Sequence, residues 1–354
     1  MPVMDMQTTS TLEKELRELA ESHGASIVGF TDKDRLKDAP PSGDITTVLP
    51  NARSAIAFAV GMSLEAAEAY VLKQDYMSLN KEHSKAYEKL AKIGKALGEL
   101  LEARGYDVHV PMPNFEYREE DNAPEKMTPV LSHKYICEAA GVGWHGWSGN
   151  LLTREFGASV LISCVVTSAE LEPSPVIDED WCSKCRICVS TCPTHYMPKQ
   201  EADEITIAGR TVRYAKRLTT WRCLLSCSGC NGRKSADAKW SNWSPNFLEG
   251  LPDRHASDEE FNKISRDIVF ANLEDPTMAG LSTVHTNKTG WGIFDDFPKT
   301  AINCSLCQYV CVPGMENRQR LYRGLVEAGT IEADDPRLNH GEPVAAATFK
   351  DYEL

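Results

Sequence analysis

The chain has 354 residues, 42% of them apolar, and a net charge of −13, so it can bury a core in two domains or in one large domain with an insert. The acidic balance weighs against nucleic acid as a partner, because phosphate contacts need clustered Lys and Arg. The N-terminus MPVMDMQTTS carries no export signal, and the longest apolar run, Ala55 to Val60, is too short to cross a membrane. These features predict a cytoplasmic protein without a membrane partner.

Helix and strand patterns alternate up to about residue 170. Ser10 and Glu13 have the spacing of a capping box, ahead of a helix that Gly24 ends. The pattern then predicts strands at 25–30 and 54–60, a long helix at 84–104, a strand starting at 107 and a strong strand at 159–166. This alternation predicts an α/β or α+β layer.

The composition of the sequence changes at Glu172, where Pro173, Pro175 and the acidic run 178–180 are typical of a linker. We therefore expect a first domain at 1–171, completed by parts of 236–300, a second domain with a long loop insert at 172–330, and a C-terminal tail at 331–354. Poor periodicity in 236–300 predicts long loops across a site. Five aromatic residues there could wall an apolar pocket or simply pack: Trp240, Trp243, Trp291, Phe294 and Phe297.

Most of the twelve cysteines sit in close groups, which in a chain of this size indicates metal ligation rather than disulfides. Cys182, Cys185, Cys188 and Cys192, followed by Pro193, give C-x2-C-x2-C-x3-C-P, the bacterial ferredoxin run. In that run three thiolates wrap one cube and the fourth points to another. Zinc prefers two separated C-x2-C pairs, so the run predicts a 4Fe–4S cluster.

A second run, Cys304, Cys307 and Cys311, is one cysteine short. Two cubes need about eight thiolates, four each, and the two runs supply seven. The residues alone leave the eighth open among Cys137, Cys164, Cys223, Cys227 and Cys230. Cys137 and Cys164 fall on a predicted helix and strand, where buried thiols usually pack.

The segment from Ala139 to Gly157 reads AAGVGWHGWSGNLLTREFG. Its five glycines and Asn150 would let the backbone approach something large and flat, or form a tight turn under the sheet. The first half contains neither a GxGxxG fingerprint nor a Walker motif, so a common nicotinamide, flavin or nucleotide site is not indicated.

This glycine-rich segment resembles the "AGLGW-x-G-[K/R]-x-x-LL-[I/L]-T-x-E-[F/Y]-G" stretch of the cobalamin-dependent iron–sulfur reductases. That superfamily comprises the reductive dehalogenases and the epoxyqueuosine reductases of tRNA modification. The similarity continues through Thr167 and Leu171, the ferredoxin run and the pair Arg222–Cys223, and it includes Tyr87 followed after eighteen residues by Tyr106. It covers roughly residues 50–315.

The resemblance implies an α+β fold: a nitroreductase-like domain that binds base-off cobalamin, beside a ferredoxin-like domain with two 4Fe–4S clusters. It implies that Cys223 is the eighth ligand and that the ligation is crossed. One cluster would be held by Cys182, Cys185, Cys188 and Cys311, and the other, nearer the cobalt, by Cys192, Cys223, Cys304 and Cys307. Cofactor contacts are expected at Gly143, His145, Gly146 and Asn150.

The chain departs from both branches of the superfamily. The acid that epoxyqueuosine reductases place three residues before a Pro-Val pair is Lys126 here, and the basic position after Gly146 is Trp147. Tyr87 matches the proton-donating tyrosine of the dehalogenases, and His145 could replace the missing cation or only hydrogen-bond the corrin or backbone. Arg154 is another candidate cation.

We therefore expect reductive dehalogenation of a small organohalide, with an external donor such as ferredoxin or flavodoxin. The alternatives are an epoxyqueuosine reductase acting on tRNA, or a ferredoxin-like electron carrier without a corrin.

Overall fold

The computed structural model describes residues 11–111, 116–118, 126–227, 234–235, 237–243, 252–272, 302–332 and 335–338. The helices are α1 (Thr11–Ser22), α2 (Leu64–Val71), α3 (Met77–Ala103), α4 (His133–Ala139), α5 (Ile187–Ser190), α6 (Trp221–Cys227), α7 (Asp258–Asn272), α9 (Leu306–Tyr309) and α10 (Met315–Ala328). The strands are β1 (Ile27–Asp32), β2 (Ser54–Gly61), β3 (Val108–His109), β4 (Trp144–His145), β5 (Leu151–Leu152), β6 (Val160–Thr167), β7 (Ala202–Ile207) and β8 (Arg210–Ala215).

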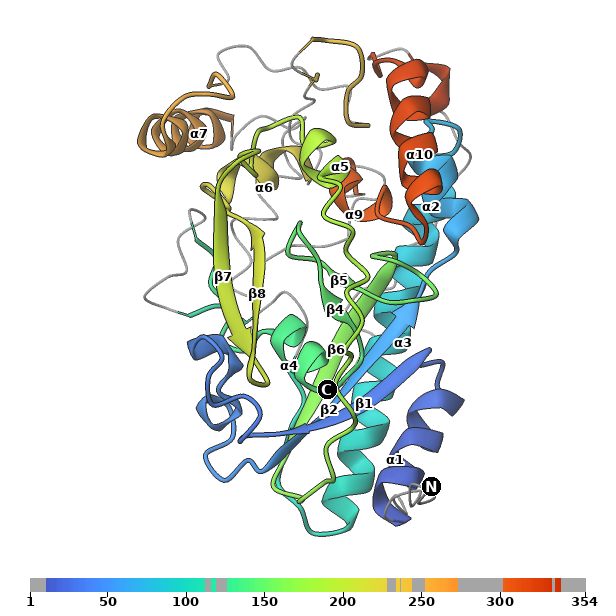
Figure 1. Cartoon of the computed structure of the whole chain (residues 1–354), viewed down its shortest axis with the longest axis vertical. Helices are drawn as coiled ribbons and strands as arrows, with labels where there is room; N and C mark the ends of the chain where they lie inside the picture. Colours follow the sequence, from blue (N-terminus) through green and yellow to red (C-terminus); the bar gives the residue numbers. More distant parts are fainter. Residues whose placement is uncertain are drawn as a thin grey trace, which may run out of the picture.

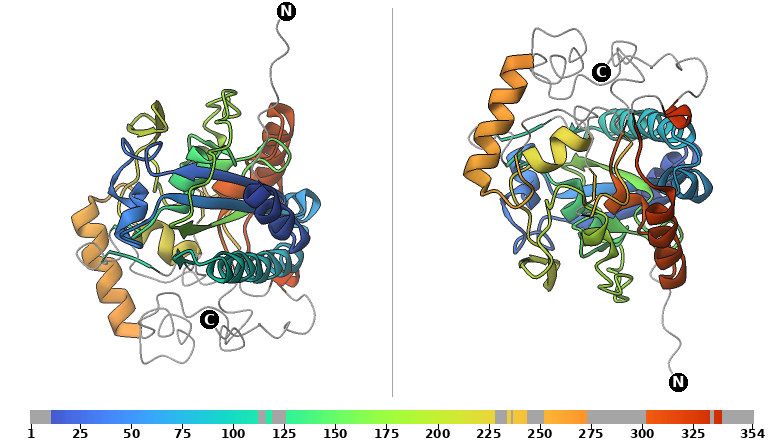
Figure 2. Two further views of the ribbon diagram at one scale, coloured as in Figure 1. Left: turned by 90° about the horizontal axis from the view of Figure 1, so that it is seen from below. Right: turned by 90° about the horizontal axis from the view of Figure 1, so that it is seen from above.

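Four strands form a central antiparallel sheet in the order β1-β2-β6-β3 (Figure 1). Ala57 of β2 pairs with Gly29 on one side and with Cys164 on the other, which fixes the register. Figure 2 shows α3 on one face of the sheet and α4 on the other. Helices thus cover both faces, as the fully apolar strand sequences require, and the predicted α+β class is confirmed.

The two faces of β2 carry side chains of different size. Ile56, Phe58 and Val60 face the core shared with α1, α2 and α3. The alternate residues, three alanines at 55, 57 and 59, face the core shared with α4. Because this second face is flat, α4 approaches closely: a Cβ added at Gly29 would lie 2.1 Å from the carbonyl oxygen of Ala140. The small residues therefore set the height of the glycine-rich segment above the sheet.

The second half of the chain packs into both cores. Ile205, Ile207 and Val212 of the β7–β8 hairpin join the core on the α4 side. The α9 and α10 helices join the core on the α3 side, and α10 lies beside α2 (Figure 1). The expected domain boundary at 171/172 stays a prediction, but the described side chains on its two sides pack together.

Several elements differ from the sequence prediction. The predicted capping box cannot be followed because Ser10 lies outside the described residues; Glu13 Oε1 accepts the backbone N–H of Glu172 at 2.8 Å. The predicted long helix begins earlier, at Met77, and the stretch predicted as loops contains α7. The β7–β8 hairpin was not predicted. Among the described helices, none combines the length and apolar character needed to cross a membrane.

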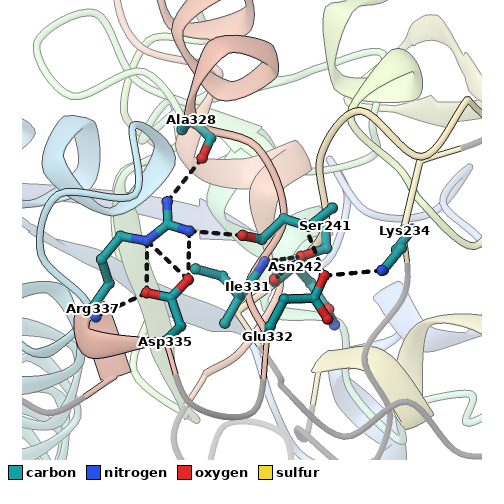
Figure 3. Close-up of polar contacts among 9 residues, drawn as sticks. Lys234, Ser241, Asn242, Ala328, Ile331, Glu332, Asp335 and Arg337 are labelled. Carbon is teal, nitrogen blue, oxygen red and sulfur yellow. Dashed lines mark hydrogen bonds and ion pairs between the residues drawn. The ribbon is translucent and has the colours of Figure 1, made fainter.

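The beginning of the predicted C-terminal tail is anchored to the core (Figure 3). Ile331 is fully buried and donates its N–H to Ser241 Oγ at 2.9 Å. Arg337 donates to Asp335 at 2.8 Å and to the carbonyl oxygens of Ala328 and Thr330. This segment therefore closes the C-terminal end of α10, whose last carbonyls need donors.

Candidate iron–sulfur and cofactor site

Two short helices carry the cysteine runs on the same backbone pattern. Arg186 follows Cys185 and caps α5 in the left-handed conformation, with φ 59°. Ser305 follows Cys304 and caps α9 in the same way, with φ 51°. Cys192 comes after α5 as Cys311 comes after α9, and the two helices pack together. The runs thus form a pseudo-repeat in which each last cysteine lies beyond its own helix.

The first cysteine group comprises Cys182, Cys185, Cys188 and Cys311. All four line one cavity, together with Gly146, Trp147, Ser148, Arg186, Ile187, Val310 and Arg318. Burial raises the pKa of the Cys188 thiol, and the neighbouring thiols raise it further. Burial likewise raises the pKa of Cys311 to about 12. Three buried thiols and the half-buried Cys185 around one cavity need a cationic centre to become thiolates.

The first group also receives a hydrogen bond from the first half of the chain. The backbone N–H of Trp147 points at Cys182 Sγ, with a distance of 3.2 Å. An N–H donor of this kind stabilises a thiolate. Within the described residues, no three His, Cys, Asp or Glu side chains are grouped closely enough for a single metal ion; a cube spreads its four thiolates farther apart than one ion does.

The second cysteine group, as the resemblance predicts it, is Cys192, Cys223, Cys304 and Cys307. Tyr196 lies within electrostatic range of both Cys192 and Cys223, and it donates its backbone N–H to Cys192 Sγ at 3.3 Å. Lys134 and Arg217 lie within the same range of both Cys223 and Cys307. Shared neighbours thus bring Cys223 close to members of both runs. Cys230 and the side chain of Cys227 lie outside the described residues.

Arg222 anchors the helix that presents Cys223. Its guanidinium is buried and pairs with Asp258 at 3.1 Å, from Nε to Oδ1. It also donates to the carbonyl oxygens of Arg254 and Ala256, each at 2.6 Å. The Arg–Cys pair noted in the sequence is therefore an anchor followed by a half-buried thiol.

The glycine-rich segment forms a small hairpin. Trp144 of β4 pairs with Leu152 of β5, and the turn closes with a bond from Gly146 N–H to the Asn150 carbonyl at 2.9 Å. Gly149 sits in this turn with φ +71°, which favours glycine. We call residues 146–150 the glycine turn. It connects the wall of the first cysteine group to the surroundings of the second.

Three glycines of this segment allow residues from the second half of the chain to pack closely against its backbone. An added Cβ at Gly141 would lie 2.1 Å from the carbonyl oxygen of Pro175. At Gly149 it would lie 2.2 Å from Arg217, and at Gly157 it would lie 2.1 Å from the Cys311 carbonyl oxygen. The segment is thus a seam between the two halves of the chain, and these glycines serve that packing.

Two of the predicted cofactor residues face protein. At Gly143, an added Cβ would meet Leu151 and Leu152. His145 is buried, with Nδ1 3.4 Å from Glu138 Oε2, and its ring lies 5.5 Å from that of Tyr214. Burial lowers the pKa of His145, while Glu138 opposes the shift. Glu138 also pairs with Arg210, so His145 belongs to a buried ionic group.

Gly146 and Asn150 are placed differently. Gly146 lines the cavity of the first cysteine group. Asn150 is half-buried at the other end of the turn, with its side-chain oxygen 3.5 Å from Lys134 Nζ. Burial, with Arg217 nearby, lowers the pKa of Lys134 to about 7. The sequence did not single out Lys134 or Arg217, because neither belongs to a recognisable motif.

The remaining candidates lie apart from one another. Tyr87 is half-buried on α3, with its ring 4.9 Å from that of His83. The carbonyl oxygen of Lys126 accepts from Thr220 Oγ1 at 3.2 Å, just before Cys223. Arg154 pairs with Glu179 on the surface, which is the structural role expected of many such residues. The structure does not bring Tyr87 and His145 together by any described contact.

The predicted aromatic pocket wall is partly core. Trp243 is fully buried, donates Nε1–H to the Tyr70 carbonyl at 3.0 Å and lies 5.1 Å from the Tyr76 ring. Trp240 is buried in the same cluster. These two residues therefore pack rather than line an opening. Trp291, Phe294 and Phe297 lie outside the described residues.

Comparison with known proteins adds a family match and named relatives. The 4Fe-4S binding domain family matches residues 175–195. Epoxyqueuosine reductase of Gloeobacter violaceus is 30% identical over 190 residues, covering 50% of this chain and 51% of the relative. Epoxyqueuosine reductase of Bacillus anthracis is 30% identical over 116 residues, which is 30% of either chain. The resemblance to the cobalamin-dependent iron–sulfur reductases is thereby confirmed.

The solved structures that match have low similarity. An epoxyqueuosine reductase with a tRNA-Tyr epoxyqueuosine-modified stem loop covers 90% of this chain and 98% of its own, at 17% identity and a TM-score of 0.42. A reductive dehalogenase, described with a mechanism for B12-dependent dehalogenation, covers 86% and 42%, at 15% identity and a TM-score of 0.45. The chain spans about half, or less, of the length of the curated relatives it matches.

The prediction against a nucleic-acid partner is wrong. The curated relatives are named epoxyqueuosine reductases, the branch of the superfamily associated with tRNA modification. The error came from using net charge, which is a sum over the whole chain and does not describe one surface. Basic groups do gather locally: the rings of His195 and His255 lie 5.0 Å apart, with Arg254 and Lys199 within electrostatic range of His195.

Proposed function

We propose that the chain is a reductase in which two 4Fe–4S clusters deliver electrons to a cobalamin at the glycine turn. The ligands are those of the first and second cysteine groups, with Cys223 completing the second. One observation carries this proposal: the glycine turn is connected to both cysteine groups. Trp147 of the turn donates its N–H to Cys182 of the first group. Arg217, which donates to the turn at Ser148, lies within electrostatic range of Cys223 and Cys307 of the second group.

The arrangement of the thiols suits two cubes with crossed ligation. Cys311 joins the three close cysteines of the other run around one cavity, and the pseudo-repeat gives Cys192 the equivalent position beyond α5. Backbone donors at Cys182 and Cys192 suit thiolate ligands. We also propose a reducing, cytoplasmic setting, because thiols used as cluster ligands must remain reduced.

The cobalamin contacts are proposed at Gly146 and Asn150. Cobalamin would supply a low-valent cobalt as the reductant of the substrate. Corrin side chains carry amides, and Asn150, Lys134 and Arg217 offer polar groups at that end of the turn. Leu151 and Leu152 fill the space beside Gly143, and Glu138 engages His145, so we propose packing roles for these two residues.

For the substrate we propose first an epoxide of the epoxyqueuosine type on tRNA. The names of the curated relatives and the local basic group at His195 and His255 support this choice. Reduction of the epoxide to an alkene takes two electrons and two protons and releases water. Lys126 stands where those enzymes carry an acid, so the protons would come from another group of this chain.

Reductive dehalogenation remains a second candidate, favoured by Lys126 and by the register of Tyr87. Replacing carbon–halogen by carbon–hydrogen takes two electrons and one proton and releases halide. Tyr87 would donate the proton from its phenol. Tyr87 is half-buried on α3, which leaves part of the side chain accessible.

Reconstitution with iron, sulfide and cobalamin tests the proposal. We expect about eight iron atoms per chain, four for each cube, and the spectrum of base-off cob(II)alamin. Iron near four, or a protein that retains no corrin on gel filtration, would reject it and favour a simple electron carrier. Single-turnover assays with dithionite then compare an epoxyqueuosine stem loop with an aryl bromide.

The two substrates separate the two candidates. Queuosine formed without bromide release supports the tRNA substrate, and bromide release that Tyr87→Phe abolishes supports dehalogenation. Activity of Tyr87→Phe equal to that of the unmodified chain removes Tyr87 from either mechanism.

A further inference from the structure

Two basic side chains, Lys134 and Arg217, hydrogen-bond to the backbone of the glycine turn. Lys134 Nζ donates to the Gly149 carbonyl oxygen at 2.8 Å. Arg217 Nη2 donates to the Ser148 carbonyl oxygen at 3.0 Å. Arg217 also fills the space where a Gly149 side chain would stand. Hydrogen bonds from charged donors are stronger than neutral ones, so the pair fixes the backbone of the turn.

The same two side chains lie within electrostatic range of Cys223 and Cys307 of the second cysteine group. Burial disfavours the charge of Arg217, yet its pKa is raised because Tyr196, Tyr214, Cys307 and Cys223 lie nearby. Cys307 and Cys223 also act on Lys134, opposing the effect of its burial. Since arginine stays charged at every ordinary pH, Arg217 places a fixed positive charge beside these two thiols.

A fixed cation has a definite effect on a cluster. Reduction adds one negative charge to a cube that is already anionic, and a nearby positive charge favours the reduced form. Cluster potentials depend on net charge, hydrogen bonding and solvent exposure. The charge of Arg217 can therefore shift the reduction potential of the cluster. Its hydrogen bond can, separately, hold the backbone of the glycine turn.

We propose that Arg217, assisted by Lys134, is a positioning residue that ties the glycine turn to the second cysteine group and raises the reduction potential of the cluster held there. This inference rests on the proposed function. It adds that electron delivery at the turn depends on a residue outside every recognised motif.

Anaerobic redox titration followed by EPR tests this role. In reconstituted Arg217→Gln we expect the reduced-to-oxidised ratio of one cluster, at a fixed solution potential, to fall about tenfold, which is 59 mV for one electron. The other cluster should be unchanged. Arg217→Lys should restore most of the shift because it keeps the charge. Arg213→Gln is the matched control, since Arg213 lies nearby on β8, pairs with Glu204 and is exposed.

The outcomes separate this inference from the proposed function. If the unmodified chain does not bind two clusters, the proposed function fails and the inference with it. If it binds two clusters and the potentials of Arg217→Gln equal those of Arg213→Gln, only the inference is wrong. Should Arg217→Gln lose the iron of one cluster, Lys134→Met replaces it, and an unchanged potential there overturns the inference equally.

Discussion

Replacing Gly157 with alanine should disturb the packing of the two halves at one of their closest contacts. Gly157 has φ +57°, and an added Cβ would lie 2.1 Å from the Cys311 carbonyl oxygen. The left-handed conformation costs an alanine roughly 1–2 kcal/mol, and overpacking against backbone adds roughly 1–3 kcal/mol. Because the obstructing atom belongs to Cys311, a proposed cluster ligand, we also expect its thiol to move away from the other three thiols of the first cysteine group.

Gly105→Ala is the matched control. Gly105 has φ +83°, but nothing lies within 4 Å of its added Cβ, so this variant experiences only the backbone strain. Urea unfolding monitored by circular dichroism should show Gly157→Ala to be destabilised by roughly 1–3 kcal/mol more than Gly105→Ala. Iron analysis should show partial loss in Gly157→Ala alone. Equal unfolding midpoints with equal iron content would refute the reasoning.

Three further changes have defined outcomes. Cys223→Ser should lower the bound iron by about half, one cube of two. The control Cys164→Ala, at a buried thiol beside His133, should bind as much iron as the unmodified chain. Equal iron in both variants would remove Cys223 from the ligand set. Arg222→Met should lower the free energy of unfolding by about 2–3 kcal/mol through its lost charged hydrogen bonds, with exposed Arg213→Met as control, and a null result in urea would contradict the anchor. The hydrogen bonds from Arg337 hold the pKa of Asp335 below its usual range. The ionised Asp335 therefore stabilises the folded chain above about pH 4, and this contribution is lost as the pH falls through the folded-state pKa. Asp335→Asn should be less stable than the unmodified chain at neutral pH and approach its stability in acid.

The sequence predicted the sheet because its strands are short apolar runs between clear breaks. Gly61, just after the 54–60 run, and Gly24, before the 25–30 run, mark such breaks. The start of α3 was missed because its cap lies one residue before the usual position: Asp75 Oδ1, not the Tyr76 side chain, accepts the N–H groups of Met77 at 2.8 Å and Ser78 at 3.1 Å. The β7–β8 hairpin did leave a signal, the alternation of Ile205, Ile207 and Val212 around a turn at Ala208–Gly209, and both turn residues have positive φ.

The candidate site was predictable where ligand chemistry fixes the spacing and not where tertiary contacts decide. The cysteine runs can be recognised because a cube requires thiolates two and three residues apart. The ionic partner of Glu138 could not be recognised, since Arg210 lies 72 residues further along the chain. The glycine-rich segment was expected to approach a flat ligand, but Gly141 and Gly157 approach Pro175 and Cys311 instead, which no local pattern records.

The packing of the glycine-rich segment between the two halves of the chain has a consequence for iron loading and for the loss of iron. The wall of the first cysteine group includes Gly146 and Trp147, and Ala158 donates its N–H to the Cys311 carbonyl oxygen at 2.9 Å. The position of the last thiol therefore depends on the folded first half, so we expect iron loading of the proposed cluster to require an intact sheet. If the proposed cluster is present, we expect loss of its iron to loosen the hairpin that carries the glycine turn before the sheet itself unfolds.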